Sequence, residues 1–253
     1  MNIAVYDSKT AMGAAAAACA AQALTSACAQ RGRAAFIAAT GASQFEFLAA
    51  LTADASIDWR ATTMFHLDEY VGIPSSHPAS FVKYLQERLV AKVHPGIVNL
   101  INGMAHDPHN ECQRLSALIG QHEIDVAFVG IGENGYLAFN DPPADFDTFD
   151  PYLVVELDTA CRRQQVGEGW FATLDDVPTH AISMSVRQIM KARAIVCTVP
   201  DERKARAVQA CFGTDDVSPL HPASILKRHP RVHVFLDTAA ASLLPHDAAS
   251  RIR

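Results

Sequence analysis

The stretch HLDEYVG, residues 66–72, places two adjacent carboxylates at the end of an apolar run, residues 62–67, that reads as a β-strand. Open α/β sheets hold their ligands at the carboxyl ends of strands. Because side chains alternate along a strand, Asp68 and Glu69 point in opposite directions. We therefore predict that Asp68 faces a cleft and that Glu69 anchors the loop that ends at Gly72; the alternative is a solvated acidic loop.

The size and composition fit one α/β domain spanning residues 1–253. The sequence is 49% hydrophobic and 19% charged. Its net charge is −6 and it contains no Lys/Arg stripe, and both observations argue against a nucleic-acid partner. We find no apolar run long enough to predict a membrane span. Six scattered cysteines without a CxxC pair indicate reduced thiols in a cytoplasmic protein. Eleven histidines lack a metal-ligand spacing, so no metal is predicted.

Short apolar runs alternate with helical stretches along the chain. We predict strands at residues 3–6, 34–39, 62–67, 126–130, 153–157, 182–186, 194–199 and 232–236. Helices are predicted at residues 9–30, 44–51, 80–89, 111–119, 202–211 and 223–227. Strand–helix alternation favours an α/β fold with a mostly parallel sheet and helices on both faces.

Two segments are suited to an anion. Thr40, Gly41, Ala42 and Ser43 follow the second predicted strand and open a helix, where backbone N–H groups and hydroxyls favour a phosphate. An ordinary turn capped by Ser43 is the alternative. Lys204 lies in the first turn of a later helix, where a cation opposes the helix dipole and an anionic ligand would offset that cost. A surface lysine is the alternative there.

The stretch GIGENGYLAFNDP, residues 130–142, comes after another predicted strand. Its three alternating glycines allow the backbone to approach a ligand closely. It fails as a dinucleotide fingerprint because no helix start supports it and because Pro142-Pro143 would interrupt a helix after the glycines. A nucleotide cofactor is therefore not predicted.

Together these motifs resemble the glucosamine-6-phosphate deaminase (isomerase) family, which also includes 6-phosphogluconolactonases. The matches run in order along nearly the whole chain: Thr40-Gly41, LDEYVG at 67–72 with HPxS at 77–80, Asn102-Gly103, residues 130–142, Lys204 and PASIL at 222–226. The AFN-x-P ending favours the deaminase branch. The resemblance implies a modified Rossmann-like α/β fold, no metal, no organic cofactor, and conversion of D-glucosamine 6-phosphate to fructose 6-phosphate and ammonia.

The resemblance also implies roles for individual residues. Asp68 matches the base that takes a proton from C2 of the sugar and returns it at C1. The Thr40–Ser43 segment and Lys204 are expected to hold the phosphate, which fixes the reacting carbons. An arginine in the region matching residues 158–165 often assists in this class, so Arg162 is a candidate, with Arg163 as the alternative.

The sequence departs from the family in the glycine-rich loop. There the family's ring-opening residue is a histidine flanked by acids, whereas this sequence has Tyr136, with Asn134 and Asp141 at the flanking positions. We count these three with Asp68 as candidate catalytic residues. A histidine with a pKa of about 6.5 is about three-quarters neutral at pH 7, but a tyrosine with a pKa of about 10 is ionised about one part in a thousand. Tyr136 is therefore a poor base.

Several interpretations stay open for this substitution. The protein is a deaminase slowed by Tyr136, an enzyme for a different sugar phosphate, or a non-catalytic sugar-phosphate-binding protein that kept the cleft. A 6-phosphogluconolactonase-like hydrolase is a further alternative, against which the AFNDP ending argues. The oligomeric state, a homo-oligomer included, is not legible from the sequence.

Overall fold

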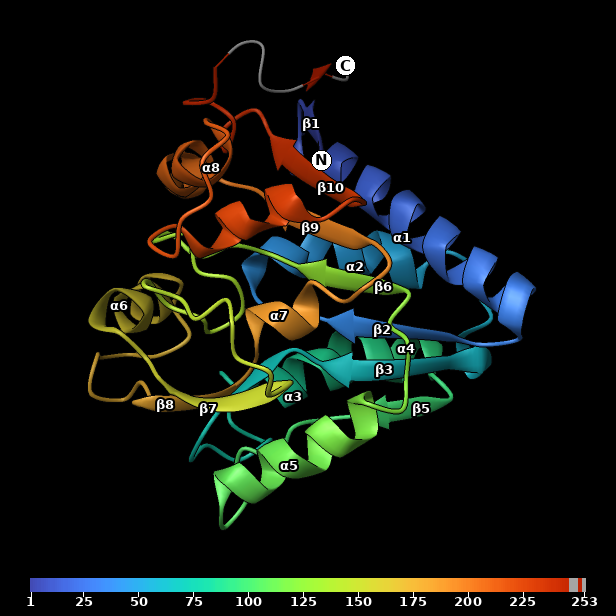
Figure 1. The fold of residues 1–253 in the computed structure, drawn as a ribbon, viewed down its shortest axis with the longest axis vertical. Coiled ribbons are helices and arrows are strands. Elements are labelled where there is room, and N and C mark those ends of the chain that lie inside the picture. Colours follow the sequence, from blue (N-terminus) through green and yellow to red (C-terminus); the bar gives the residue numbers. More distant parts are fainter. Residues whose placement is uncertain (246–249, 252–253) are drawn as a thin grey trace.

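A parallel β-sheet forms the centre of the structure, a computed structural model that describes residues 1–245 and 250–251 (Figure 1). Within these residues the sheet has eight strands in the order β11, β1, β10, β9, β6, β2, β3, β5. Their bounds in chain order are β1 Asn2–Tyr6, β2 Ala34–Ala38, β3 Thr62–His66, β5 Ile97–Asn99, β6 Val126–Val129, β9 Ile195–Val199, β10 Val232–Asp237 and β11 Ser250–Arg251. Every pairing in this sheet is parallel.

A smaller antiparallel sheet lies beside the carboxyl end of β3. It contains β4 Asp68–Tyr70, β7 Tyr152–Glu156 and β8 His180–Met184, with β8 in the middle. Leu67 joins the two sheets, because its N–H donates to the carbonyl of Ala38 in β2 while its carbonyl accepts from Met184 in β8. Asp68, the next residue, is thereby fixed at the junction between the sheets.

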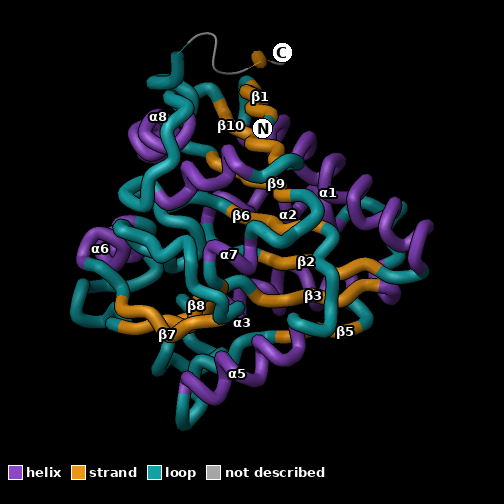
Figure 2. The backbone as a smooth tube through the Cα atoms, in the orientation of Figure 1, coloured by secondary structure: helices purple, strands orange, loops and turns teal. Residues whose placement is uncertain are grey.

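Helices cover both faces of the large sheet (Figure 2). The α-helices are α1 Lys9–Arg31, α2 Phe45–Thr52, α3 Phe81–Leu85, α4 Ala91–Val93, α5 Pro108–Ile119, α6 Thr159–Gly167, α7 Val186–Ile189 and α8 Ala205–Phe212. Side-chain alternation along β2 divides the core. Phe36 packs with α1 and α2 on one face, whereas Ile37 packs in the cluster that includes α5, α7 and α8 on the other.

The predicted fold class is confirmed: the sheet is mostly parallel and helices flank it on both faces. The eight predicted strands are all present, but those at 153–157 and 182–186 belong to the small antiparallel sheet, and Val186 already begins α7. The predicted helix 80–89 divides into α3 and a π-helical turn at Gln86–Val90, and that at 223–227 is a 3₁₀ helix, Pro222–Arg228. Strands β4, β5 and β11 and helices α4, α6 and α7 were not predicted.

The expectation that no apolar run is long enough for a membrane span is wrong by length and composition. Among the described residues, α1 is long and apolar enough to cross a membrane by these two criteria alone. The structure gives these residues a different environment: one side of α1, including Met12, Ala16, Ala20 and Leu24, is buried in the core that lies between this helix, α2 and the sheet. A buried core helix has the same composition as a membrane span, so this finding is weak evidence for a membrane.

Candidate active site at the strand ends

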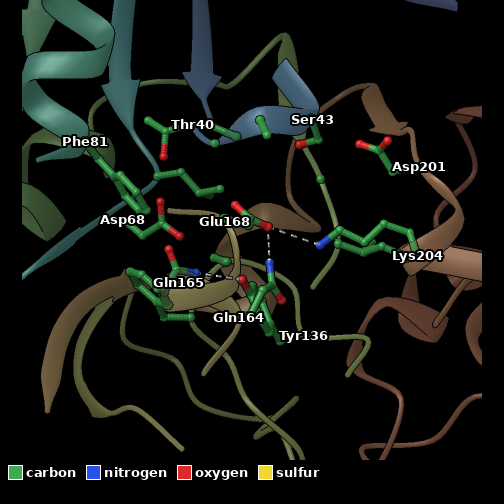
Figure 3. Close-up of a pocket in the computed structure, with 18 of the residues that line it drawn as sticks. Thr40, Ser43, Asp68, Phe81, Tyr136, Gln164, Gln165, Glu168, Asp201 and Lys204 are labelled. Atoms are coloured by element: carbon green, nitrogen blue, oxygen red, sulfur yellow. Dashed lines mark hydrogen bonds and ion pairs between the residues drawn. The ribbon is translucent and has the colours of Figure 1, made fainter. Parts of the chain in front are cut away.

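A cleft opens where four neighbouring strands of the large sheet end. Strands β9, β6, β2 and β3 are adjacent and parallel, so the segments after them meet at one edge of the sheet. The cleft encloses about 620 Å³ of empty space, its open mouth included. Its polar lining consists of Thr40, Ser43, Asp68, Tyr136, Gln164, Gln165, Glu168, Asp201, Arg203 and Lys204, together with the backbone of Gly41, Ala42 and Gly130 (Figure 3).

Asp68 lies in the cleft with its side chain largely withdrawn from water. The residue is 6% exposed, and no side-chain or backbone donor within the described ranges bonds to its carboxylate. Burial first, and the neighbouring Glu69 second, raise the pKa of Asp68 to about 8. A carboxyl with a pKa near the working pH can both take and return a proton.

Glu69 points away from the cleft and anchors the loop, as predicted. Its carboxylate accepts hydrogen bonds from the Ser80 hydroxyl (2.8 Å) and from the backbone N–H groups of Val82 (2.8 Å) and Phe81 (3.2 Å). These donors belong to the first turn of α3 and its cap, where a negative charge is favourable. The alternation that turns Glu69 toward α3 turns Asp68 toward the cleft.

All four residues of the Thr40–Ser43 segment line the cleft, directly after β2. Gly41 has a φ of 93°, a backbone conformation that favours glycine. Its carbonyl accepts from the Tyr84 hydroxyl (2.9 Å), and the Ser43 carbonyl accepts from the Thr198 hydroxyl (3.2 Å). The segment is thus held from both sides.

Lys204 enters the cleft from the turn after β9 and is 5% exposed. Burial lowers the pKa of its ammonium group, and Glu168, whose nearer oxygen lies 3.9 Å from Nζ, opposes that shift. The neighbouring Arg203 also lines the cleft and lies 3.9 Å from Asp201 and 3.8 Å from Glu133. Two cations therefore line the cleft, and Lys204 lies on the side opposite Asp68 (Figure 3).

The structure separates the three candidate residues of the glycine-rich loop. Tyr136 lines the cleft, whereas Asn134 and Asp141 do not. The Asn134 amide turns to the other side of the loop, where it donates to Asp141 (3.3 Å) and Asp158 (3.4 Å). Asp141 lines a separate groove outside the cleft, and burial raises its pKa to about 6.

Tyr136 packs its ring against Gly132, where an added Cβ would lie 2.1 Å from ring carbons. The close approach that this glycine permits is therefore to Tyr136. The Tyr136 hydroxyl accepts from Gln165 Nε2 (3.4 Å), and Gln165 Oε1 accepts from the Tyr70 hydroxyl (2.7 Å). Burial raises the pKa of Tyr136 well above its usual value, so the phenol is neutral and can donate a hydrogen bond.

Neither arginine of α6 reaches the cleft. The Arg162 guanidinium donates to the carbonyls of Leu174 (2.6 Å) and Val177 (3.0 Å), which ties α6 to the loop after it. Arg163 is exposed and is not part of the lining. The arginine that lines the cleft together with Lys204 is Arg203, not Arg162 or Arg163.

Sequence reasoning missed several residues of the lining: Gln164, Gln165, Glu168, Asp201 and Arg203. Arg203 had a usable signal, because it precedes Lys204 in the same turn after a predicted strand. The two glutamines and Glu168 had none, because α6 was not predicted and their position depends on how this helix packs across the cleft.

A model of the family described as glucosamine-6-phosphate isomerases/6-phosphogluconolactonase matches residues 7–234 of the chain. A glucosamine-6-phosphate deaminase of Listeria monocytogenes is 38% identical over 207 residues, which cover 81% of this chain and 86% of the relative. A glucosamine-6-phosphate deaminase of an Exiguobacterium species is 40% identical over 188 residues, covering 74% and 72% of the two chains.

Solved structures share the fold. One described as a monomeric glucosamine-6-phosphate deaminase has a TM-score of 0.87 at 27% identity and covers 96% of this chain and 100% of its own. A 6-phosphogluconolactonase from Shewanella baltica has a TM-score of 0.78 at 17% identity, covering 94% and 98%. At that identity the second likeness concerns the fold alone.

Proposed function

Because the chain belongs to the glucosamine-6-phosphate isomerase/6-phosphogluconolactonase family, we propose that it converts D-glucosamine 6-phosphate and water to fructose 6-phosphate and ammonia. The relatives named above as deaminases support this branch of the family. One observation carries the proposal: Asp68, with a pKa of about 8, lines the same cleft as the Thr40–Ser43 segment and Lys204.

The proposed reaction assigns the two sides of the cleft to two parts of the substrate. Lys204, Arg203 and the Thr40–Ser43 segment bind the phosphate, which directs the other end of the open-chain sugar toward Asp68. The Asp68 carboxylate takes the proton from C2 and returns it to C1, so that the C2–nitrogen bond becomes an imine. Water then adds to C2, the carbon–nitrogen bond breaks, and ammonia leaves the ketose.

We propose that this protein does not catalyse ring opening and acts on the open-chain fraction of its substrate. Ring opening needs a group that exchanges protons with the ring oxygen and the C1 hydroxyl, and Tyr136 is the candidate in the cleft. Its raised pKa leaves it a donor without base strength at neutral pH. We therefore expect the enzyme to depend on sugar that has opened spontaneously in solution.

Ammonia release from glucosamine 6-phosphate tests this function directly. We expect measurable release by the purified protein and at least about tenfold faster release by Tyr136→His, because an imidazole supplies the missing base. Asp68→Asn serves as the inactive control. Absence of ammonia from both the natural protein and Tyr136→His would overturn the proposal.

The neutral Tyr136 also favours a second candidate, a sugar-phosphate-binding protein without turnover. That candidate predicts binding of glucosamine 6-phosphate by calorimetry, no ammonia from either variant, and unchanged binding in Asp68→Asn. The same preparations, assayed with 6-phosphogluconolactone, would reveal a hydrolase instead.

A further inference from the structure

Glu168 is an acid inside the cleft for which the proposed reaction has no role. It comes directly after α6, and Gly169, with a φ of 79°, then turns the chain back. The Glu168 side chain is 7% exposed, and its carboxylate lies between Asp68 and Lys204 (Figure 3). A substrate that reaches from the lysine to the aspartate must pass it.

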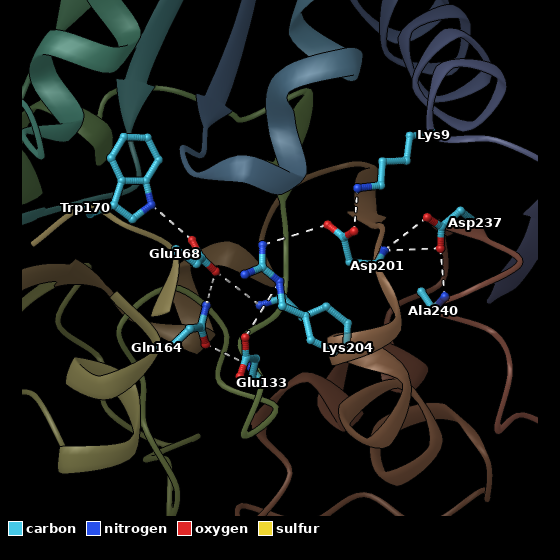
Figure 4. A network of polar contacts seen from close by, with 10 residues as sticks. Lys9, Glu133, Gln164, Glu168, Trp170, Asp201, Lys204, Asp237 and Ala240 are labelled. Carbon is cyan, nitrogen blue, oxygen red and sulfur yellow. Dashed lines mark hydrogen bonds and ion pairs between the residues drawn. The ribbon is translucent and has the colours of Figure 1, made fainter. Parts of the chain in front are cut away.

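The carboxylate of Glu168 is held in place by neutral donors. Gln164 Nε2 donates to Oε1 (2.7 Å) and Trp170 Nε1 donates to Oε2 (3.1 Å) (Figure 4). Gln164 is itself fixed, because its Oε1 accepts from the backbone N–H of Glu133 (2.8 Å). A carboxylate oxygen can accept about two hydrogen bonds, so each keeps capacity for a donor from a ligand.

Lys204 lacks a hydrogen-bond acceptor among the residues that the structure describes. Its Nζ is 3.9 Å from Glu168 Oε1, which is an ion pair but too long for a hydrogen bond. The residue as a whole is 5% exposed, and its ammonium group has three protons. These protons can therefore be donated to an anionic ligand that enters the cleft.

We propose that Glu168 and Lys204 form a paired receptor for a phosphate ester that carries a hydroxyl group close to its phosphate. Lys204 binds the phosphate, and Glu168 accepts a hydrogen bond from the hydroxyl, so Glu168 determines specificity within the cleft. This inference rests on the proposed function insofar as that function makes the cleft a sugar-phosphate site.

The charge of Glu168 explains why such a receptor is selective. A fully ionised phosphate monoester without hydroxyl groups, placed beside Lys204, is repelled by the nearby carboxylate and has no proton to donate to it. A phosphate ester with a neighbouring hydroxyl meets the same repulsion but adds a hydrogen bond to a charged acceptor. Glu168 therefore discriminates against esters without a hydroxyl, in favour of hydroxylated esters.

Calorimetric binding of two probes at about pH 8, where both phosphates are dianions, tests this inference without requiring turnover: glycerol 3-phosphate and propyl phosphate. The natural protein should bind glycerol 3-phosphate about tenfold or more tightly than propyl phosphate, which lacks the hydroxyls. In Glu168→Gln that preference should fall to about twofold or less, while propyl phosphate should bind about 3- to 10-fold more tightly.

Glu202→Gln is the matched control. Glu202 precedes Lys204 in the same turn, is exposed and lies outside the cleft lining, so its loss changes net charge equally. We expect it to leave the ratio between the two esters unchanged. Glu168→Asp retains the charge but withdraws the carboxylate, so it should lose the preference without tighter binding of propyl phosphate. This variant provides the test if Glu168→Gln does not fold.

Two results would overturn the inference. Equal weakening of both probes in Glu168→Gln would mean that the residue only supports the fold, and equal tightening would mean that it only repels anions. If the natural protein shows the expected preference and neither it nor Tyr136→His releases ammonia, the proposed deaminase reaction is overturned and the receptor stays intact.

Discussion

Asp68 holds its proton more tightly in the folded protein than in the unfolded chain. Its pKa is about 8 in the fold, against an ordinary value of 3.8. As a proton acceptor it must be ionised in the free enzyme, so we expect kcat/KM for glucosamine 6-phosphate to rise about tenfold per pH unit below about pH 8 and to level off above it. Initial rates at subsaturating substrate between pH 6 and 9.5 measure this, and a flat profile would contradict it.

The same pKa predicts the stability of Asp68→Asn. Above about pH 4 the unfolded chain releases this proton while the fold retains it up to about pH 8, so stability falls across that window as the pH rises. An amide cannot ionise, and each pKa unit is worth about 1.4 kcal/mol. We expect the free energy of unfolding of Asp68→Asn to exceed that of the natural protein by about 2–4 kcal/mol at pH 8, measured by urea titration.

Glu69→Gln is the matched comparison at the adjacent acid. Both Glu69 oxygens face backbone N–H donors, so an amide NH₂ group would meet a donor in either orientation. We expect this variant to lose about 2 kcal/mol or more. A gain in stability at residue 69, or a loss at residue 68, would contradict the opposite orientation of the two side chains.

The sequence was enough to predict the opposite orientations of Asp68 and Glu69, because the alternation of side chains along a strand is a local property. It did not suffice for Asn134 and Asp141, which the structure turns away from the cleft, because the direction of a loop side chain depends on its distant partners, here Asp158. Arg162 is similar: the carbonyls that bind it lie 12 and 15 residues further along the chain.

At the scale of elements, α1 and α2 approach so closely that a glycine is needed between them. A Cβ added at Gly13 would lie 2.7 Å from the backbone carbon of Glu46 and 2.8 Å from the nitrogen of Phe47. In an open helix, glycine to alanine stabilises by about 1 kcal/mol. We expect Gly13→Ala instead to lower the free energy of unfolding by about 1–3 kcal/mol, because the helices must move apart.

Gly167→Ala in α6 provides the control, since a Cβ there meets nothing within 4 Å. It should be neutral or stabilising by up to about 1 kcal/mol in the same urea titration. Equal effects of the two substitutions would show that the spacing between α1 and α2 is not limiting.

Elements with a strong local pattern were predictable, and those that depend on pairing were not. The alanine-rich α1 and the apolar β2 and β6 are clear in the sequence. Strand β4 has three residues, two of them acids, and is a strand because it pairs with β8. Helix α6, with polar residues such as Arg163 and Gln164, has no apolar stripe that would reveal it.

For the whole molecule, binding at the cleft couples to global stability. A ligand that binds the folded state alone stabilises it by RT ln(1 + [L]/Kd), about 2.7 kcal/mol at a hundredfold excess over Kd. We expect 10 mM inorganic phosphate to raise the melting temperature by at least about 2 °C relative to chloride at equal ionic strength. Lys204→Met should abolish this rise.

Arg163→Gln is the control for that experiment, because it removes a cation of α6 that lies outside the cleft. It should retain the phosphate-dependent rise in melting temperature. Loss of the rise in Arg163→Gln, with retention in Lys204→Met, would place the anion site on α6.

The order of strands in the large sheet has a consequence for how the protein is made. Strand β1 pairs with β10 and β11, whose residues leave the ribosome more than 220 positions later. Until β10 has emerged, the first strand lacks its partners in the sheet as the structure describes it. Such distant pairing slows folding and leaves an open edge exposed to other nascent chains. We infer that chaperone dependence in the cell is concentrated in this interval.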